Sequence, residues 1–322
     1  MKTLTTPGRP FSVDASEYPF TSHWFEQNGA RMHYLDEGTG PAVLLLHGNP
    51  TWSYLYRNVI KALRSEVRCI APDYPGFGFS DHPTNYGYTP REHAQWVNAL
   101  IDHLGLTQII LVCQDWGGPI GLSIATQRPQ DFSSLVILNT WCWRPNLQST
   151  FFSLLMGSRF PGRTLQMKKN FFAKTVVPRC IFHKERVAAT LRKAYTDPFP
   201  TEASRIGTWV FPREIRRSAD WLEEIESRLP RLRDKPATLV WAMKDPAFGK
   251  PWYLTRWQTI FPQAQTDILD DASHYLQEDR PDRIIAAIKT AGGTQQHSRS
   301  NRAATSCDKA WRQPSIHKED TP

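Results

Sequence analysis

One aspartate of this chain stands in a setting that suits a covalent nucleophile. Asp115 follows the apolar run Ile109–Cys113 and precedes a Trp-Gly-Gly sequence. Where a buried strand turns sharply into a helix, the residue at the turn is lifted above the edge of the sheet, and small neighbours let the backbones approach. A carboxylate at such a turn can attack carbon without first losing a proton. The same aspartate could instead cap a helix that starts at Gly117, and this segment alone leaves both interpretations open.

His274 and Asp245 could complete a catalytic triad with this aspartate. His274 stands in a loop near the end of the chain, after a nucleophile and an acid, which is an order known for such triads. Asp245 follows an apolar run typical of a strand and could hold the imidazole in one tautomer. Asp245 could also be a turn aspartate, since Pro246 comes next. The end of the preceding strand offers Asn139 and no carboxylate, which favours Asp245 as the acid.

A loop with a His-Gly dipeptide could supply electrostatic stabilisation. The residues His47-Gly48-Asn49-Pro50 follow another buried apolar run. In this arrangement one backbone N–H comes from the loop and a second from the residue after the nucleophile. We therefore expect the backbone N–H groups of Asn49 and Trp116 to form an oxyanion hole beside Asp115.

These residues need a scaffold of alternating strands and helices. The hydrophobic pattern predicts strands at 31–37, 43–46, 67–71, 109–112, 135–138, 237–241 and 265–269, and helices at 53–63, 90–104, 117–128, 251–261 and 281–289. Such alternation indicates an α/β fold with a mostly parallel sheet that helices cover on both faces.

The alternation stops after Leu138 and resumes at Ala237. Residues 141–234 have apolar side chains at helical intervals, for example at Phe151 and Phe152, and at Leu154 and Leu155. We interpret them as a helical cap between a first part of the core at 20–140 and a second part at 235–291. Its aromatic residues would exclude water from an apolar cavity, and we expect the regions of Phe171 and Trp209 to line it. Residues 292–322 lack periodicity and are expected to be disordered.

Composition excludes several classes of protein. The 322 residues are 40% hydrophobic and 22% charged, contain no apolar run long enough to cross a bilayer, and begin without an apolar export signal. Five cysteines form no CxxC pair, which argues against a disulfide framework and a zinc site, so we expect reduced thiols, no metal and a cytoplasmic protein. The net charge of +8 comes from residues 144–233, where 18 Lys and Arg face 8 Asp and Glu. That segment has no nucleic-acid motif, so we expect neither nucleic acid nor membrane as partner.

The combined motifs resemble the haloalkane dehalogenases of the α/β-hydrolase superfamily, over about residues 20–290. Beyond the segments above, the agreement includes the stretch from Asp73 to Ser80, the sequence Asn-Thr-Trp from Asn139, and the stretch from Lys244 to Gly249. The resemblance implies an α/β-hydrolase fold with an inserted cap. It also implies that Asp115 is the nucleophile, His274 the base and Asp245 the acid, with the side chains of Asn49 and Trp116 binding the halide.

The resemblance implies hydrolysis of carbon–halogen bonds without a cofactor. A haloalkane and water would give a primary alcohol, a halide ion and a proton, through a covalent alkyl ester on Asp115. A carboxylate suits attack on an sp³ carbon, and the leaving halide needs N–H donors that are aimed at it in advance.

Three other interpretations stay open. An epoxide hydrolase would use the same aspartate and histidine, but it would need cap tyrosines, of which the chain offers Tyr195, and an aromatic residue at the position of Asn49. A coelenterazine-type luciferase would place its acid where Asn139 stands. The chain could also be a non-catalytic receptor for a small molecule, although Asp115, Asp245 and His274 are all present.

Overall fold

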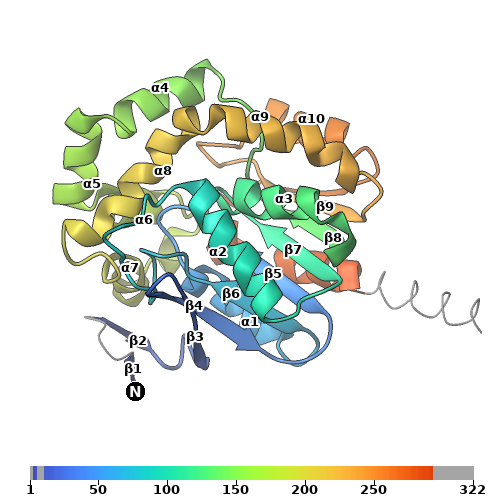
Figure 1. The fold of residues 1–322 in the computed structure, drawn as a ribbon, viewed down its shortest axis with the longest axis horizontal. Helices are drawn as coiled ribbons and strands as arrows, with labels where there is room; N and C mark the ends of the chain where they lie inside the picture. The colour runs from blue at the N-terminus through green and yellow to red at the C-terminus, as the bar shows by residue number, and fades with distance from the viewer. Residues whose placement is uncertain (1–2, 6–10, 293–322) are drawn as a thin grey trace, which may run out of the picture.

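The computed structural model describes residues 3–5 and 11–292, and its centre is a single large sheet (Figure 1). Eight strands run in the order β10-β9-β8-β7-β5-β6-β4-β3. Their bounds are Ser22–Gln27 (β3), Ala30–Glu37 (β4), Ala42–Leu46 (β5), Arg68–Pro72 (β6), Ile109–Cys113 (β7), Phe132–Ile137 (β8), Ala237–Ala242 (β9) and Gln265–Leu269 (β10). All neighbours from β10 to β6 are parallel, whereas β4 pairs antiparallel with β6 and β3. The predicted mostly parallel α/β sheet is confirmed.

Helices cover both faces of this sheet. They are α1 (Arg57–Leu63), which continues a 3₁₀ turn at Ser53–Tyr56, α2 (Pro90–His103), α3 (Gly117–Gln127), α10 (Pro251–Ile260), α11 (Leu276–Asp279) and a last helix at 281–292. Side chains of α2, α3 and α10 join one apolar cluster with the sheet, and those of α1 and the last helix join a second cluster on the other face. The central strands are buried on both faces, as their continuous apolar runs predict.

Local sequence explains where these elements begin and end. Helix α2 starts with a capping box, because Thr89 accepts from the Glu92 N–H while the Glu92 carboxylate accepts from the Thr89 N–H. Pro90 fits the first turn because that position needs no N–H donor. A short pair of strands at the N-terminus, β1 (Thr3–Thr5) and β2 (Ser12–Asp14), lies apart from the main sheet.

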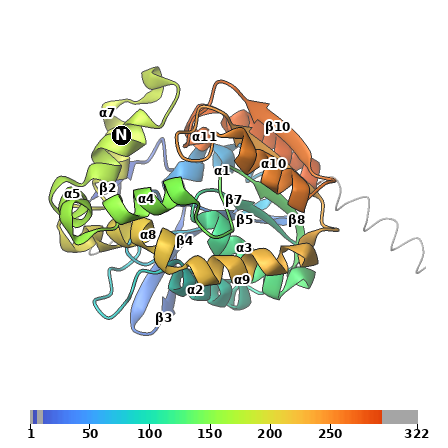
Figure 2. The same ribbon diagram turned by 90° about the horizontal axis from the view of Figure 1, so that it is seen from above.

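The segment between β8 and β9 is helical, as predicted. It contains α4 (Leu147–Met156), α5 (Thr164–Lys169), α6 (Val177–Arg179), α7 (Ala189–Thr196), α8 (Ile206–Arg217) and α9 (Ala219–Arg228), joined by short 3₁₀ and π turns. Helix α4 packs along α8 on the outer side of the molecule, away from the sheet (Figures 1 and 2). The division into core, cap and core stays a prediction, and the packing of α9 against α3 argues against counting α9 with the cap.

Helix α4 and the C-terminal tail differ in how far the structure describes what the sequence predicts. The apolar side chains of α4 do not all point inward, because Phe151, Phe152, Leu154 and Leu155 are exposed. The tail expected to be disordered falls, from residue 293 onward, outside the described residues. Within the described ranges, no helix combines the length and the apolar character that crossing a bilayer requires.

Candidate active site

The predicted site residues meet at one edge of the sheet. Asn49 follows β5, Asp115 follows β7, Asp245 follows β9 and His274 follows β10. These strands are parallel, and Leu46 at the end of β5 lies opposite Cys113 at the end of β7. The loops that leave their carboxyl ends therefore converge on one crevice, where ligands of open α/β sheets bind.

Asp115 occupies a strained strand-to-helix turn. Its φ angle is +49°, in the left-handed region that residues with a side chain rarely adopt. The turn is tight because a Cβ at Gly117 would overlap the Leu46 carbonyl and a Cβ at Gly48 would overlap the Asp115 carboxylate. The helix-cap interpretation of Asp115 is not observed, since the residue before α3 makes no side-chain cap and the carboxylate accepts from the Asn49 N–H across the sheet.

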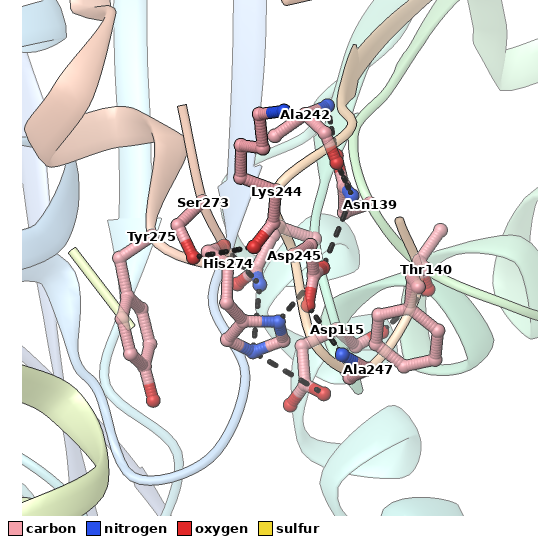
Figure 3. Close-up of polar contacts among 12 residues, drawn as sticks. Asp115, Asn139, Thr140, Ala242, Lys244, Asp245, Ala247, Ser273, His274 and Tyr275 are labelled. Carbon is pink, nitrogen blue, oxygen red and sulfur yellow. Dashed lines mark hydrogen bonds and ion pairs between the residues drawn. The ribbon is translucent and has the colours of Figure 1, made fainter. Parts of the chain in front are cut away.

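The imidazole of His274 lies between the carboxylates of Asp245 and Asp115 (Figure 3). The Nδ1 atom of His274 is 3.0 Å from Oδ2 of Asp245, and its Nε2 atom is 3.9 Å from Oδ2 of Asp115. The Asn49 N–H donates to Oδ1 of Asp115 at 2.8 Å, and the Trp116 N–H also hydrogen-bonds this carboxylate. Oδ1 of Asp115 is thus held by the Asn49 N–H, and Oδ2 lies beside the imidazole.

Asn139 orients the acid and was not singled out for that role from the sequence. Its Nδ2 donates to Oδ2 of Asp245 at 3.0 Å and to the Ala242 carbonyl at 2.9 Å, while its Oδ1 accepts from the Ala242 N–H at 2.7 Å. The Ala247 N–H donates to the other oxygen of Asp245 at 2.7 Å. The sequence carries a signal for this contact, because Asn139 follows β8 and Asp245 follows the neighbouring strand β9.

Gln114, directly before the nucleophile candidate, is a second residue that the sequence did not reveal. Its Nε2 donates to the His274 carbonyl at 3.1 Å and lies 3.2 Å from Nε2 of the same histidine. Gln114 is fully buried. Gln114 therefore holds the loop that carries His274. It lies at the Nε2 side of the imidazole, whereas Asp245 lies at the Nδ1 side.

The side chain of Asn49 is held by the helical segment above the sheet. Its Nδ2 lies 3.3 Å from the carbonyl oxygen of Thr208 in α8, and a carbonyl can only accept, so the amide turns its nitrogen to α8. Thr208 is free to accept because the residue four positions later is Pro212, which has no N–H to close the helical bond. The second N–H of the amide remains available for another acceptor. Oδ1 of Asn49 is buried and has no partner among the described residues.

An apolar cavity of about 360 Å³ opens over these groups. It is lined by Asn49, Asp115, Trp116, Trp141, Gln148, Ser149, Phe152, Met156, Phe171, Phe172, Val176, Cys180, Pro212, Ile215, Pro246, Ala247, Phe248, Tyr253, His274 and Tyr275. The expectation for the Phe171 region is confirmed. In the region of Trp209 the lining comes from Pro212 and Ile215 of α8, whereas the Trp209 side chain is not part of it, because its indole N–H donates to the Ser158 carbonyl.

Burial and charge set the protonation behaviour of the site. Burial raises the pKa of Asp115, although His274 and the N–H groups of Asn49 and Trp116 oppose the shift. Burial by itself would lower the pKa of His274, but the carboxylates of Asp245 and Asp115 outweigh it, and the pKa is raised. Each of the two groups therefore stabilises the charged form of the other. The described residues contain no group of three or more side chains that could hold a metal ion.

The sharp turn at Asp115 and the late histidine define an α/β-hydrolase with an aspartate at the nucleophile position. A family model described as "alpha/beta hydrolase fold" matches residues 41–281. Haloalkane dehalogenase 2 of Mycobacterium tuberculosis is 41% identical over 280 residues, which cover 86% of this chain and 97% of that protein. The chain therefore belongs to the haloalkane dehalogenase family of the α/β-hydrolases.

Two further relatives bear on substrate and fold. A cis-3-alkyl-4-alkyloxetan-2-one decarboxylase of Shewanella oneidensis is 34% identical over 281 residues, which cover 84% of this chain and 88% of that protein. The crystal structure of the haloalkane dehalogenase DbeA from Bradyrhizobium elkani superposes with a TM-score of 0.79 at 27% identity, covering 87% of this chain and 99% of that one.

Proposed function

We propose that this protein hydrolyses haloalkanes through a covalent alkyl ester on Asp115. The observation that carries the proposal is the position of the Asp115 carboxylate. It lies on a strained turn at the floor of an apolar cavity, with Oδ1 bound to the Asn49 N–H and Oδ2 3.9 Å from His274. Small uncharged halogenated hydrocarbons fit such a cavity, because its walls are mostly aliphatic and aromatic.

In the first step, Oδ2 of Asp115 attacks the carbon that bears the halogen. A carbon–oxygen bond forms, the carbon–halogen bond breaks, and the halide leaves with the electron pair. Oδ1 stays bound to the Asn49 N–H, which leaves Oδ2, beside His274, as the nucleophile. The indole N–H of Trp116 and the second amide N–H of Asn49 donate hydrogen bonds to the leaving halide and stabilise its developing negative charge.

In the second step, water cleaves the ester. His274 takes a proton from a water molecule as the hydroxide adds to the carbonyl carbon of Asp115, and Asp245 stabilises the imidazolium. The backbone N–H groups of Asn49 and Trp116 bind the resulting oxyanion. Collapse of this intermediate expels the alcohol and restores the carboxylate, so the balance is haloalkane and water to alcohol, halide and a proton.

The test is bromide release from short 1-bromoalkanes by the purified protein. We expect steady release by the parent, none by Asp115→Ala, and for His274→Phe a stoichiometric mass increase of one alkyl group on Asp115. His103→Phe, which changes an exposed histidine at the end of α2, is the matched control and should behave as the parent. Absence of both bromide and an alkylated His274→Phe protein would refute the proposal.

A second candidate is decarboxylation of 3,4-dialkyloxetan-2-ones, which the similarity to the Shewanella oneidensis relative favours. Carbon dioxide release from such a lactone, without bromide release from bromoalkanes, would assign this activity instead. The epoxide hydrolase alternative loses support because Tyr195, the cap tyrosine it needs, is buried and donates to Glu278 at 2.5 Å. Turnover of styrene oxide would nevertheless assign epoxide hydrolysis. Binding of a small molecule without turnover of any of these substrates would favour a non-catalytic receptor.

We also propose that the protein works in the cytoplasm with reduced thiols. The cysteines of the described residues, Cys69, Cys113, Cys142 and Cys180, form no disulfide. Titration of all five thiols in denatured, unreduced protein tests this.

A further inference from the structure

The outer side of α4 and the turn that follows it carry a set of exposed apolar side chains. Leu147 is 91%, Phe151 69% and Phe160 80% exposed. Six of the nine large apolar residues exposed in the described part of the chain fall within residues 147–160. We call this set the α4 face; it consists of Leu147, Phe151, Phe152, Leu154, Leu155 and Phe160. A cluster of this kind marks an interaction surface, whereas single exposed apolar residues need no explanation.

The α4 face lies within a longer basic stretch of the chain. Residues 141–180 contain seven Lys and Arg and no Asp or Glu. Arg144 pairs with Asp220 and Glu223. The six others form no ion pair with a described residue; they are Arg159, Arg163, Lys168, Lys169, Lys174 and Arg179. The partner of the α4 face therefore has to accept apolar side chains and offer negative charge beside them.

The α4 face also adjoins the cavity of the candidate active site. Ser149 and Met156 of α4 line that cavity from the inner side of the helix. Phe152 belongs to both surfaces, because it lines the cavity and is exposed. A partner that covers the α4 face would thus lie next to the cavity.

We propose that the α4 face docks on an anionic lipid surface. This departs from the expectation from composition that a membrane is not a partner, because composition does not show which apolar side chains the fold leaves exposed. Helix α4 itself has no charged residue, and the Lys and Arg lie in the segments before and after it. An apolar helix face of this kind enters the acyl boundary of a membrane, while basic residues next to it in the chain reach the headgroups. A second copy of the chain fits less well, because a symmetric contact would bring the same unpaired basic residues together. Haloalkanes partition into lipid, so docking would give the cavity direct access to its substrate; this last step rests on the proposed function.

The test is sedimentation of the full chain with vesicles in the absence of substrate. We expect binding to phosphatidylcholine vesicles that contain phosphatidylglycerol, much weaker binding to pure phosphatidylcholine, and release by high salt. Lys168→Gln/Lys169→Gln should weaken binding by about tenfold or more, since each basic residue near an anionic surface contributes about 1 kcal/mol. Phe151→Ser/Leu154→Ser should weaken it similarly, because neither side chain lines the cavity and both would enter the lipid.

Two matched variants separate this surface from general charge and hydrophobicity. Arg233→Gln/Lys235→Gln removes two basic residues just before β9, at the opposite edge of the sheet, and Ile268→Ser removes a 52% exposed apolar residue on β10. Both should bind as the parent does. The proposal is overturned if vesicles with phosphatidylglycerol do not sediment the protein, or if control and α4 variants bind equally. It is also overturned if the lipid-free protein is an oligomer that Phe151→Ser/Leu154→Ser dissociates, since that assigns the α4 face to a second copy.

Discussion

The carbonyl oxygen of Thr208 accepts a hydrogen bond from the side-chain amide of Asn49 at 3.3 Å because Pro212 leaves that carbonyl without its helical N–H. A proline inside α8 thereby sets the orientation of an amide that follows β5 in the core. The amide is fixed with its nitrogen toward α8, and its second N–H is available to a leaving halide. Halide binding by Asn49, as proposed above, would therefore depend on the position of α8 through this one side chain.

Pro212→Ala should weaken halide binding. The new N–H of residue 212 would compete for the Thr208 carbonyl and release the Asn49 amide, so we expect a bromide Kd that is about threefold to tenfold higher, as for loss of one hydrogen bond. The fold should not suffer, because alanine favours a helix interior more than proline does. Quenching of tryptophan fluorescence by bromide measures the Kd, since Trp116 lines the same cavity.

A double-mutant cycle distinguishes this role from a change in cavity shape. If Pro212 acts through Asn49, its substitution should have little further effect on bromide binding in an Asn49→Ala background. Ile215→Ala removes another cavity side chain of α8, and its effect should persist in that background. If Pro212→Ala and Ile215→Ala both change the bromide Kd in the Asn49→Ala background as much as in the parent, Pro212 contributes only to the cavity wall.

Asn139→Ala should slow hydrolysis of the ester more than its formation. The substitution removes the amide that holds Oδ2 of Asp245 and leaves the Ala242 N–H without its acceptor. We expect about a tenfold slower second step, against about 10⁴-fold for Asp245→Asn, which would impose the wrong imidazole tautomer. Single-turnover experiments with a bromoalkane resolve the two steps, and an equal loss in both would speak against this role.

Much of this site could be predicted because its residues follow buried strands. The continuous apolar runs of β5, β7 and β9 identify strands that are covered on both faces, and such strands end at one edge of a parallel sheet. Asn49, Asp115 and Asp245 therefore had to converge there. The strain at Asp115 follows as well, since a strand can pass directly into a helix only through a sharp turn.

Other features depend on contacts that sequence spacing does not encode. The link from Asn49 to Thr208 spans 159 residues and uses a backbone carbonyl, which carries no residue-specific signal. The edge strand β3 was missed because its side chains are mostly half-buried and do not alternate. The helical period of α4 was recognised, but a period cannot tell whether the apolar side faces the core or a partner outside the molecule.

The pH dependence of the two steps should lie on the acid side. Ester formation needs an ionised Asp115 and hydrolysis needs a neutral His274, and the pKa of each group is raised, so both rates fall as the pH drops through these values. Asp245→Asn removes the charge that contributes most to raising the pKa of His274. In this variant, the pH below which the residual rate of ester hydrolysis falls should therefore be lower than in the parent. Single-turnover assays at several pH values measure this rate. If the hydrolysis rate of Asp245→Asn falls at the same pH as that of the parent, a group other than His274 controls the pH dependence.

Asp73 is expected to stabilise the loops beside the site without taking part in the reaction. It is fully buried and accepts from the Ser53 N–H at 2.7 Å and the Phe79 N–H at 3.0 Å, and its Oδ2 is 2.9 Å from Nδ1 of His33. Burial opposes its ionisation, but His33 and the two N–H groups outweigh burial, and the pKa of Asp73 is lowered. Asp73→Asn should reduce the free energy of unfolding by about 2–4 kcal/mol at neutral pH, because a buried charged acceptor loses its charge.

The loss of unfolding free energy caused by Asp73→Asn should depend on pH. A carboxyl whose pKa is lower in the folded than in the unfolded chain stabilises the fold above the unfolded value, about 3.9, and stops doing so as the pH falls through the folded value. The difference between parent and Asp73→Asn should therefore be full at neutral pH and shrink below about pH 4 in urea titrations. Asp220→Asn, which breaks an exposed pair with Arg144, is the control and should cost less than about 1 kcal/mol. A difference that is constant down to the lowest pH would mean that packing, and not the charge of Asp73, holds these loops.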